Sequence, residues 1–146
     1  MQNKAVKLSA AAVVLFFLVL LAGMVLAPRV AHLYGAWRAL PQSAIRVLIA
    51  AFYGCVVPAM IAMVCLFLLL RNIRLERPFL EENSRLMAII SWCCAAVAVV
   101  TLVSCFWYMP LLFVSAPMAF IFLIVRVVRN CFIAAIQLKE ENRLTI

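Results

Sequence analysis

Negative charge is confined to two short, similar stretches of an otherwise apolar and basic chain. The first, LEENSRLM, spans residues 80–87, and the second, LKEENRLTI, spans residues 138–146. Four of the five acidic residues lie in these copies, the fifth is Glu76 just ahead of the first, and the chain contains no Asp. Paired carboxylates attract cationic partners, so the two stretches are the candidate recognition residues.

Catalysis and metal binding have little support in the residue types. The only His is His32, and the six Cys residues form no CxxC pair, so a zinc site lacks suitable partners. The apolar segments hold no paired carboxylates and no nucleophile beside a general base. We therefore predict a protein that is not an enzyme and that binds no metal and no cofactor.

The composition is that of an integral membrane protein. Hydrophobic residues make up 70% of the 146 residues and charged residues only 12%, whereas a soluble domain has about 45–50% and about 25%. A soluble core of this size could not hide so much apolar surface, and lipid is the alternative solvent. We predict a single membrane domain over residues 1–146.

Four apolar runs give the chain its organisation, and the first ends just ahead of Pro28. The fourth is followed by a helical pattern that continues toward the C-terminus. The predicted fold is an all-α integral membrane four-helix bundle, built from two antiparallel hairpins, with a cytoplasmic C-terminal helical extension. The helices are expected at about 8–26, 45–70, 86–106 and 110–128, and the cytoplasmic tail at 129–146.

The positive charges predict the orientation. Ten of the 13 Lys and Arg residues fall at the termini and in the second loop, and Arg29, Arg38 and Arg46 fall on the other side. The positive-inside rule then places both termini in the cytoplasm. The net charge of +8 is better explained by helix ends at lipid headgroups than by nucleic acid. Headgroup contacts are expected at Arg71, Arg74, Arg126 and Arg129.

A helix end accounts for the acidic residues of the first stretch but not for those of the second. Glu81 and Glu82 suit the first turn of the third helix, where the helix dipole favours acids. Glu140 and Glu141 lie near a helix C-terminus, where acids are disfavoured, so a cationic partner is needed. That partner could be Arg74 or Arg77 of this chain, or a basic protein. Since both stretches are predicted to be cytoplasmic, we expect them to form one surface.

The tail should present an apolar face of Val128, Cys131, Phe132, Ala135 and Ile136.

The segments RPFLEENSRL and LKEENRLTI resemble those of the small bacterial four-helix membrane family catalogued as domain of unknown function 2975. Arg143 stands where that family usually has an acidic residue. The family has no established activity. Its genes often neighbour the gene of a short helix-turn-helix regulator. The resemblance therefore implies that this protein lies in the bacterial plasma membrane and is a partner of a small DNA-binding protein, which it holds or releases.

We therefore predict a regulatory or interaction protein whose cytoplasmic face binds a small helix-turn-helix transcription regulator. The partner-binding residues would be Glu76, Phe79, Glu81, Glu82, Leu138, Glu140, Glu141, Leu144 and Ile146.

Two alternatives remain open. One is a small transporter or channel component, although no Asp, Glu, Lys or His lies deep in the apolar runs, where ion-coupled transport usually needs such groups. The polar residues at depth are expected to bond to helix backbones. The other is a membrane sensor or immunity protein for a peptide or lipid. Its receptor surface would contain His32, Tyr34, Trp37 and Arg38.

Overall fold

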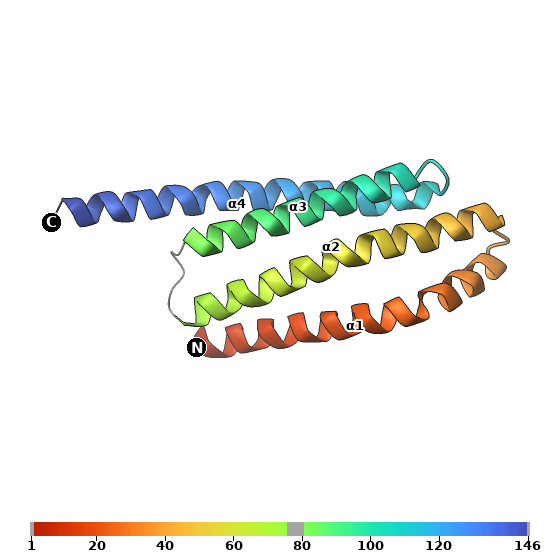
Figure 1. Ribbon diagram of the computed structural model, residues 1–146, viewed down its shortest axis with the longest axis horizontal. Helices are drawn as coiled ribbons and strands as arrows, with labels where there is room; N and C mark the ends of the chain where they lie inside the picture. The colour runs from red at the N-terminus through yellow and green to blue at the C-terminus, as the bar shows by residue number, and fades with distance from the viewer. Residues whose placement is uncertain (1, 76–80, 146) are drawn as a thin grey trace.

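The computed structural model describes residues 2–75 and 81–145, and these residues form four long helices and one short one (Figure 1). The elements are α1 (Gln2–Trp37), α2 (Gln42–Arg74), α3 (Glu81–Ser104), the 3-10 helix η1 (Met109–Leu111) and α4 (Leu112–Leu144). In the described part of the chain, four helices are long and apolar enough to cross a membrane. The predicted all-α membrane fold of four helices is confirmed.

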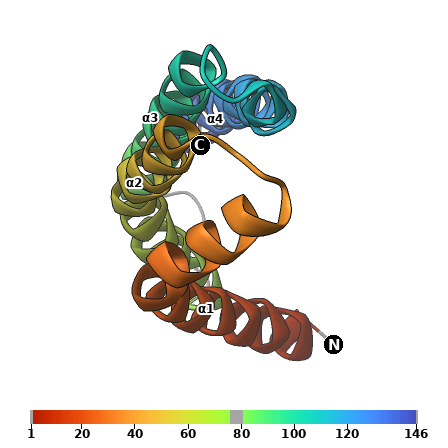
Figure 2. The same ribbon diagram turned by 90° about the vertical axis from the view of Figure 1, so that its right-hand side faces the viewer.

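The helices pack in chain order. In the described residues α1 contacts α2, α2 contacts α3 and α3 contacts α4, while no backbone contact joins α1 to α4. Seen along the helices, the four form an arc that is open between α1 and α4 (Figure 2). Both termini lie at one end, here called the terminal end (Figure 1). The opposite end, which carries the turns at residues 38–41 and 105–108, is called the turn end.

The helices extend beyond the predicted bounds. The first was expected to end at about residue 26 but continues to Trp37, so Pro28 lies inside it. The second begins at Gln42, and the third runs from Glu81 to Ser104. The fourth continues without a break from the predicted span at 110–128 to Leu144. Most of the predicted tail at 129–146 is therefore part of α4, and the helical extension is confirmed.

A side chain from α2 explains why α1 can continue through Pro28. Proline has no backbone N–H, so the carbonyl four residues earlier, that of Met24, loses its helical donor. The Tyr53 hydroxyl donates a hydrogen bond to the Met24 carbonyl oxygen at 2.9 Å. In hydrocarbon no water can serve that oxygen, so the phenol satisfies a backbone group that the proline leaves unpaired.

The C-terminus of α1 is closed by a Schellman motif. The Leu40 N–H donates to the Gly35 carbonyl oxygen at 2.9 Å, and the Ala39 N–H donates to that of Ala36 at 3.4 Å. Ala39 takes the left-handed conformation, with φ of 50°, at the position where glycine is usual. Pro41 follows and leads directly into α2. The connection between α1 and α2 is consequently only four residues long.

The short turn brings α1 and α2 into close contact. A Cβ at Gly35 would meet the side chain of Ile45, coming within 2.7 Å of its Cγ1 atom. Ile45 is buried and β-branched, so its side chain has little freedom to move in a helix. The bare Cα of Gly35 is thus what permits the two helices to approach at the turn end.

The interior of the bundle holds mainly small residues, both apolar and polar, and large apolar side chains cover its outside. Asn83 and Ser91 are the largest fully buried side chains, while Phe106 and Phe113 are 85% exposed. The Ser91 hydroxyl donates to the Ala88 carbonyl and Thr101 to that of Val97, as predicted for polar residues at depth. The Ser115 hydroxyl instead crosses from α4 to the Ala98 carbonyl of α3 at 3.1 Å. Polar groups thus join neighbouring helices beside the small apolar contacts.

The Tyr53 hydrogen bond can be tested with a double-mutant cycle. Tyr53→Phe should lower the free energy of unfolding by about 1 kcal/mol, because the Met24 carbonyl loses its donor. Pro28→Ala restores a backbone N–H for that carbonyl, so the cost of Tyr53→Phe should shrink in this background. Unfolding of the full chain in mixed micelles would measure both costs. Equal costs in the two backgrounds would contradict the pairing.

The Schellman motif predicts that two glycine substitutions change the free energy of unfolding in opposite directions. Ala39→Gly should raise the free energy of unfolding by up to about 1 kcal/mol, because glycine adopts positive φ without a steric penalty. Ala36→Gly, at an exposed helical position three residues earlier, should lower it by about 0.5–1 kcal/mol. Thermal melts followed by circular dichroism would compare them, and destabilisation by both would refute this assignment.

Candidate partner-binding site

A cleft at the terminal end lies between the beginning of α3 and the second half of α4. Its volume is about 370 Å³. Two carboxylates and two guanidinium groups face it, together with aliphatic and polar side chains. The lining residues are Glu81, Ser84, Arg85, Arg129, Ile133, Ile136, Gln137 and Glu140.

The cleft brings the two EEN stretches together. Glu81 comes from the first copy and Glu140 from the second, and both line the same cavity although they lie on different helices. The sequence predicted that the two copies share one surface, and the shared cleft supports this. The cations beside Glu140 are Arg85 and Arg129, rather than Arg74, which was considered from the sequence; Arg77 lies outside the described residues.

Arg129 attaches α4 to α3. Its Nε atom donates to the Ser84 carbonyl oxygen at 3.2 Å, and the residue is half-buried. The other three arginines predicted to contact lipid are exposed: Arg71, Arg74 and Arg126. The Arg126 guanidinium also lies 5.8 Å from the centre of the Phe122 ring, a cation–π distance. Headgroup contacts at all four residues stay a prediction.

The asparagine of the first EEN copy holds α3 against α2. Asn83 is only 1% exposed, and its Oδ1 atom accepts a hydrogen bond from the Asn72 Nδ2 at 2.9 Å. Glu81 and Glu82 are exposed in the first turn of α3, as expected for acids at a helix N-terminus. The first copy thus has a structural residue, Asn83, beside its two exposed acids.

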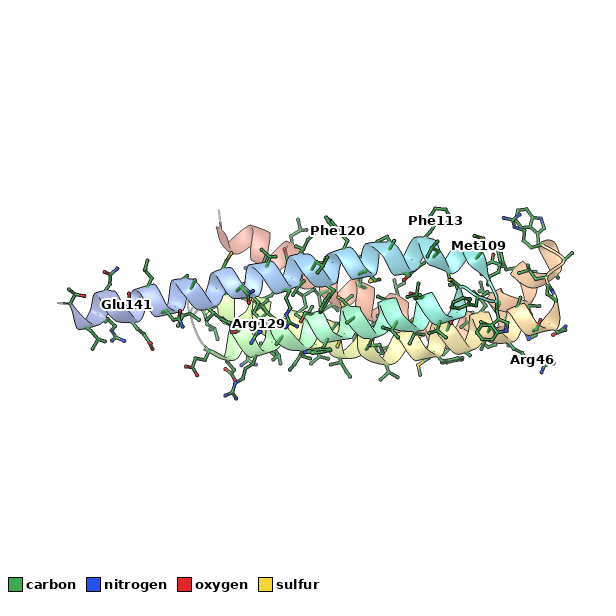
Figure 3. The ribbon with its side chains drawn as sticks, turned by 90° about the horizontal axis from the view of Figure 1, so that it is seen from above. Arg46, Met109, Phe113, Phe120, Arg129 and Glu141 are labelled. Carbon is green, nitrogen blue, oxygen red and sulfur yellow. The ribbon has the colours of Figure 1, made fainter. Side chains whose placement is uncertain are left out.

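The second copy lies on a projecting helix end, here called the α4 extension and defined as residues 137–145. Every residue in it is exposed, with Leu138 at 65% and Leu144 at 88%. The extension runs beyond the ends of the other helices (Figure 1), and Figure 3 shows Glu141 on it, well past Arg129. Asn142, the counterpart of Asn83, is exposed.

The comparisons with known proteins give one match. Residues 10–146 match the model of a family described as "Protein of unknown function (DUF2975)". The chain belongs to this family. No curated protein and no solved structure matches it.

The apolar face predicted for the tail is only partly packed in this DUF2975 protein. Phe132 and Ile136 are half-buried, whereas Val128, Cys131 and Ala135 are exposed. The half-buried positions at this end are Arg129, Phe132, Ile133 and Ile136. Arg129 shows that this helix also turns a polar side chain toward its neighbour.

Of the predicted partner-binding residues, the structure brings Glu81 and Glu140 into the cleft. It leaves Glu82, Leu138, Glu141 and Leu144 on the exposed surface around it. Glu76, Phe79 and Ile146 lie outside the described residues. Sequence reasoning missed Asn72, and it placed Ser84 and Arg85 on the predicted surface without giving either a separate role. An uncharged polar residue between Arg71 and Arg74 was the one available signal for Asn72.

The two EEN asparagines form a matched pair for a stability test. Asn83→Ala should lower the free energy of unfolding by about 1–3 kcal/mol, because it leaves the Asn72 amide without its acceptor in a buried site. Asn142→Ala should change it by less than about 0.5 kcal/mol, since the side chain is exposed. Denaturation of both variants in mixed micelles would show the contrast. Similar values for the two would mean that Asn83 is not a joint between α2 and α3.

Proposed function

We propose that this DUF2975 protein is a membrane-anchored interaction protein, and that the cleft and the α4 extension bind a soluble protein partner. The observation that carries this proposal is the convergence of the two EEN stretches on one cleft beside a fully exposed helix end. The proposed activity is binding, with no reaction catalysed.

Charge on this surface is patterned rather than uniformly negative. Glu81, Glu82, Glu140 and Glu141 are balanced by Arg85, Arg129, Lys139 and Arg143. Alternating charges select partners through specific ion pairs and disfavour wrong registers more than they add affinity. Leu138 and Leu144 add exposed apolar area that a soluble partner would cover.

The partner we propose is a small, basic helix-turn-helix transcription regulator. The gene neighbourhood implied by the family resemblance supports this choice, as does the exposure of both glutamate pairs to a partner arriving from outside the bundle. The proposed location of the site is the cytoplasmic side of a bacterial plasma membrane. Supporting this orientation, ten of the 13 Lys and Arg residues fall at the termini and in the second loop of the sequence. Binding there would hold the regulator away from DNA.

The test is co-purification of a helix-turn-helix protein, encoded next to the gene of this protein, with the detergent-solubilised full chain. Changing Glu81, Glu82, Glu140 and Glu141 to Gln should weaken binding about tenfold or more at low salt. Truncation after Ile136, which removes the α4 extension, should abolish it. Arg143→Glu, which introduces the acid typical of the family, should strengthen it.

Asn142→Ala is the matched control, because it alters an exposed residue of the same extension without changing its charge. Binding that survives both the quadruple Gln substitution and the truncation would refute the proposed site. Failure of the regulator to bind the unmodified chain would refute the proposed partner.

A further inference from the structure

The concave side of the helix arc encloses an apolar groove at the turn end. Its volume is about 640 Å³, within the range of about 300–1,000 Å³ that small-molecule sites occupy. Side chains from α1, α2, α3, η1 and α4 line it, including Ala27 and Ala31 of α1, Phe52 of α2 and Val114 of α4. In the described residues α1 and α4 do not contact each other through their backbones, and residues of both line the groove.

A polar cluster lies next to the groove at its outer end. The Tyr34 and Tyr108 hydroxyl oxygens are 2.7 Å apart and share a hydrogen bond. Tyr34 is one turn beyond the groove residues Val30 and Ala31, on the same face of α1. The backbone carbonyl of Tyr108 accepts a hydrogen bond from the backbone N–H of Leu111, which also lines the groove, at 3.1 Å. The pair therefore connects α1 to the α3–α4 hairpin at the groove's edge.

Arg38 gives this cluster a positive charge. It lies four residues after Tyr34, just past the end of α1, and its backbone N–H donates to the Tyr34 backbone carbonyl at 3.0 Å. A side-chain hydrogen bond with Tyr34 raises the pKa of the Arg38 guanidinium. The hydrogen bond with Tyr34 likewise raises the pKa of the Tyr108 phenol, so both groups keep their protons. One of the two phenol protons is used within the pair, which leaves the other for an outside acceptor.

This arrangement has the polarity of a phospholipid. Ala27 and Ala31 of the apolar groove are followed on α1, at helical spacing, by Tyr34, and Arg38 comes just past the end of the helix. Hydrogen-bond donors and a cation therefore lie beyond the apolar lining. We infer that the groove binds one glycerophospholipid, with an acyl chain along Ala27 and Ala31 and the phosphate at Arg38 and the Tyr34–Tyr108 pair. Arg and Tyr donors suit phosphate oxygens, and charge-assisted hydrogen bonds are the stronger kind. The site is at the opposite end of the molecule from the proposed partner-binding cleft.

Native mass spectrometry of the full chain, titrated with phosphatidylglycerol in mild detergent, would test the apolar part of the site. The unmodified chain should retain one lipid. Ala27→Phe, which fills the groove, should reduce retention at least fivefold. Val25→Phe is the matched control, since Val25 is exposed on the same helix and does not line the groove, and it should leave retention unchanged. Equal retention by both variants would overturn the proposal.

The headgroup contact needs its own comparison. Arg38→Gln should weaken phosphatidylglycerol binding about tenfold, the effect of losing a hydrogen bond to a charged group. Arg46→Gln, at an exposed arginine of α2 at the same end (Figure 3), should not. Diacylglycerol, which lacks the phosphate, should bind the unmodified chain and Arg38→Gln equally and weakly.

Three results would overturn the inference. Diacylglycerol binding as tight as phosphatidylglycerol would show that the phosphate is not recognised. Displacement of the lipid by millimolar inorganic phosphate would show a site for the free anion. A dimer carrying no lipid would show that a second copy covers the groove.

Discussion

Backbone hydrogen bonding in a solvent without water is the constraint on which the structure depends. Each N–H and C=O inside hydrocarbon must find a partner within the protein, which favours long, unbroken helices with their ends outside the apolar layer. The helices largely follow this pattern, and the C-terminus of α1 closes its last carbonyls through the Schellman motif at residues 35–40. Prolines interrupt it inside α1, α2 and α4, at Pro28, Pro58 and Pro117. In α1 the Tyr53 hydroxyl compensates from the neighbouring helix.

The same constraint reverses the usual arrangement of polar and apolar residues. Since lipid accepts large apolar side chains as readily as a protein interior does, burying them gives little association between helices. Small and polar residues occupy the contacts, as in the Asn72–Asn83 pair between α2 and α3 and the Ser115–Ala98 bond between α3 and α4. Among the described residues, each long helix contacts only its neighbours in chain order. Such contacts are compatible with an arc of helices as well as with a closed bundle, and an arc has a concave inner side.

The existence of four helices, and their antiparallel order, could be predicted from the sequence, because long apolar runs and short connections determine both. The end of α1 could not, because proline is compatible with a helix interior as well as a helix end, and the hydroxyl that pairs the freed carbonyl belongs to a residue 25 positions after Pro28. Topology alone was enough to predict that the two EEN stretches lie toward the same end of the molecule, where Glu81 and Glu140 line one cleft. It could not show that Asn83 is buried between α2 and α3 while Asn142 is exposed. Both asparagines follow a pair of glutamates, and they differ in the helices that pack against them. The Tyr34–Tyr108 pair joins residues 74 positions apart, and each tyrosine alone is an ordinary interfacial aromatic.

The length of α4 has a mechanical consequence. Its 33 residues form one continuous rod, about 50 Å long at the usual rise per residue. One end of this rod lies against the concave groove at Val114, and the other carries the exposed extension. Ser115 ties this rod to α3 near the groove end, and Arg129 ties it to α3 near the middle. Glu141 lies about 18 Å further along the rod than Arg129 at the usual rise per residue, so a tilt of about 5° around Arg129 would displace Glu141 by about 1.5 Å.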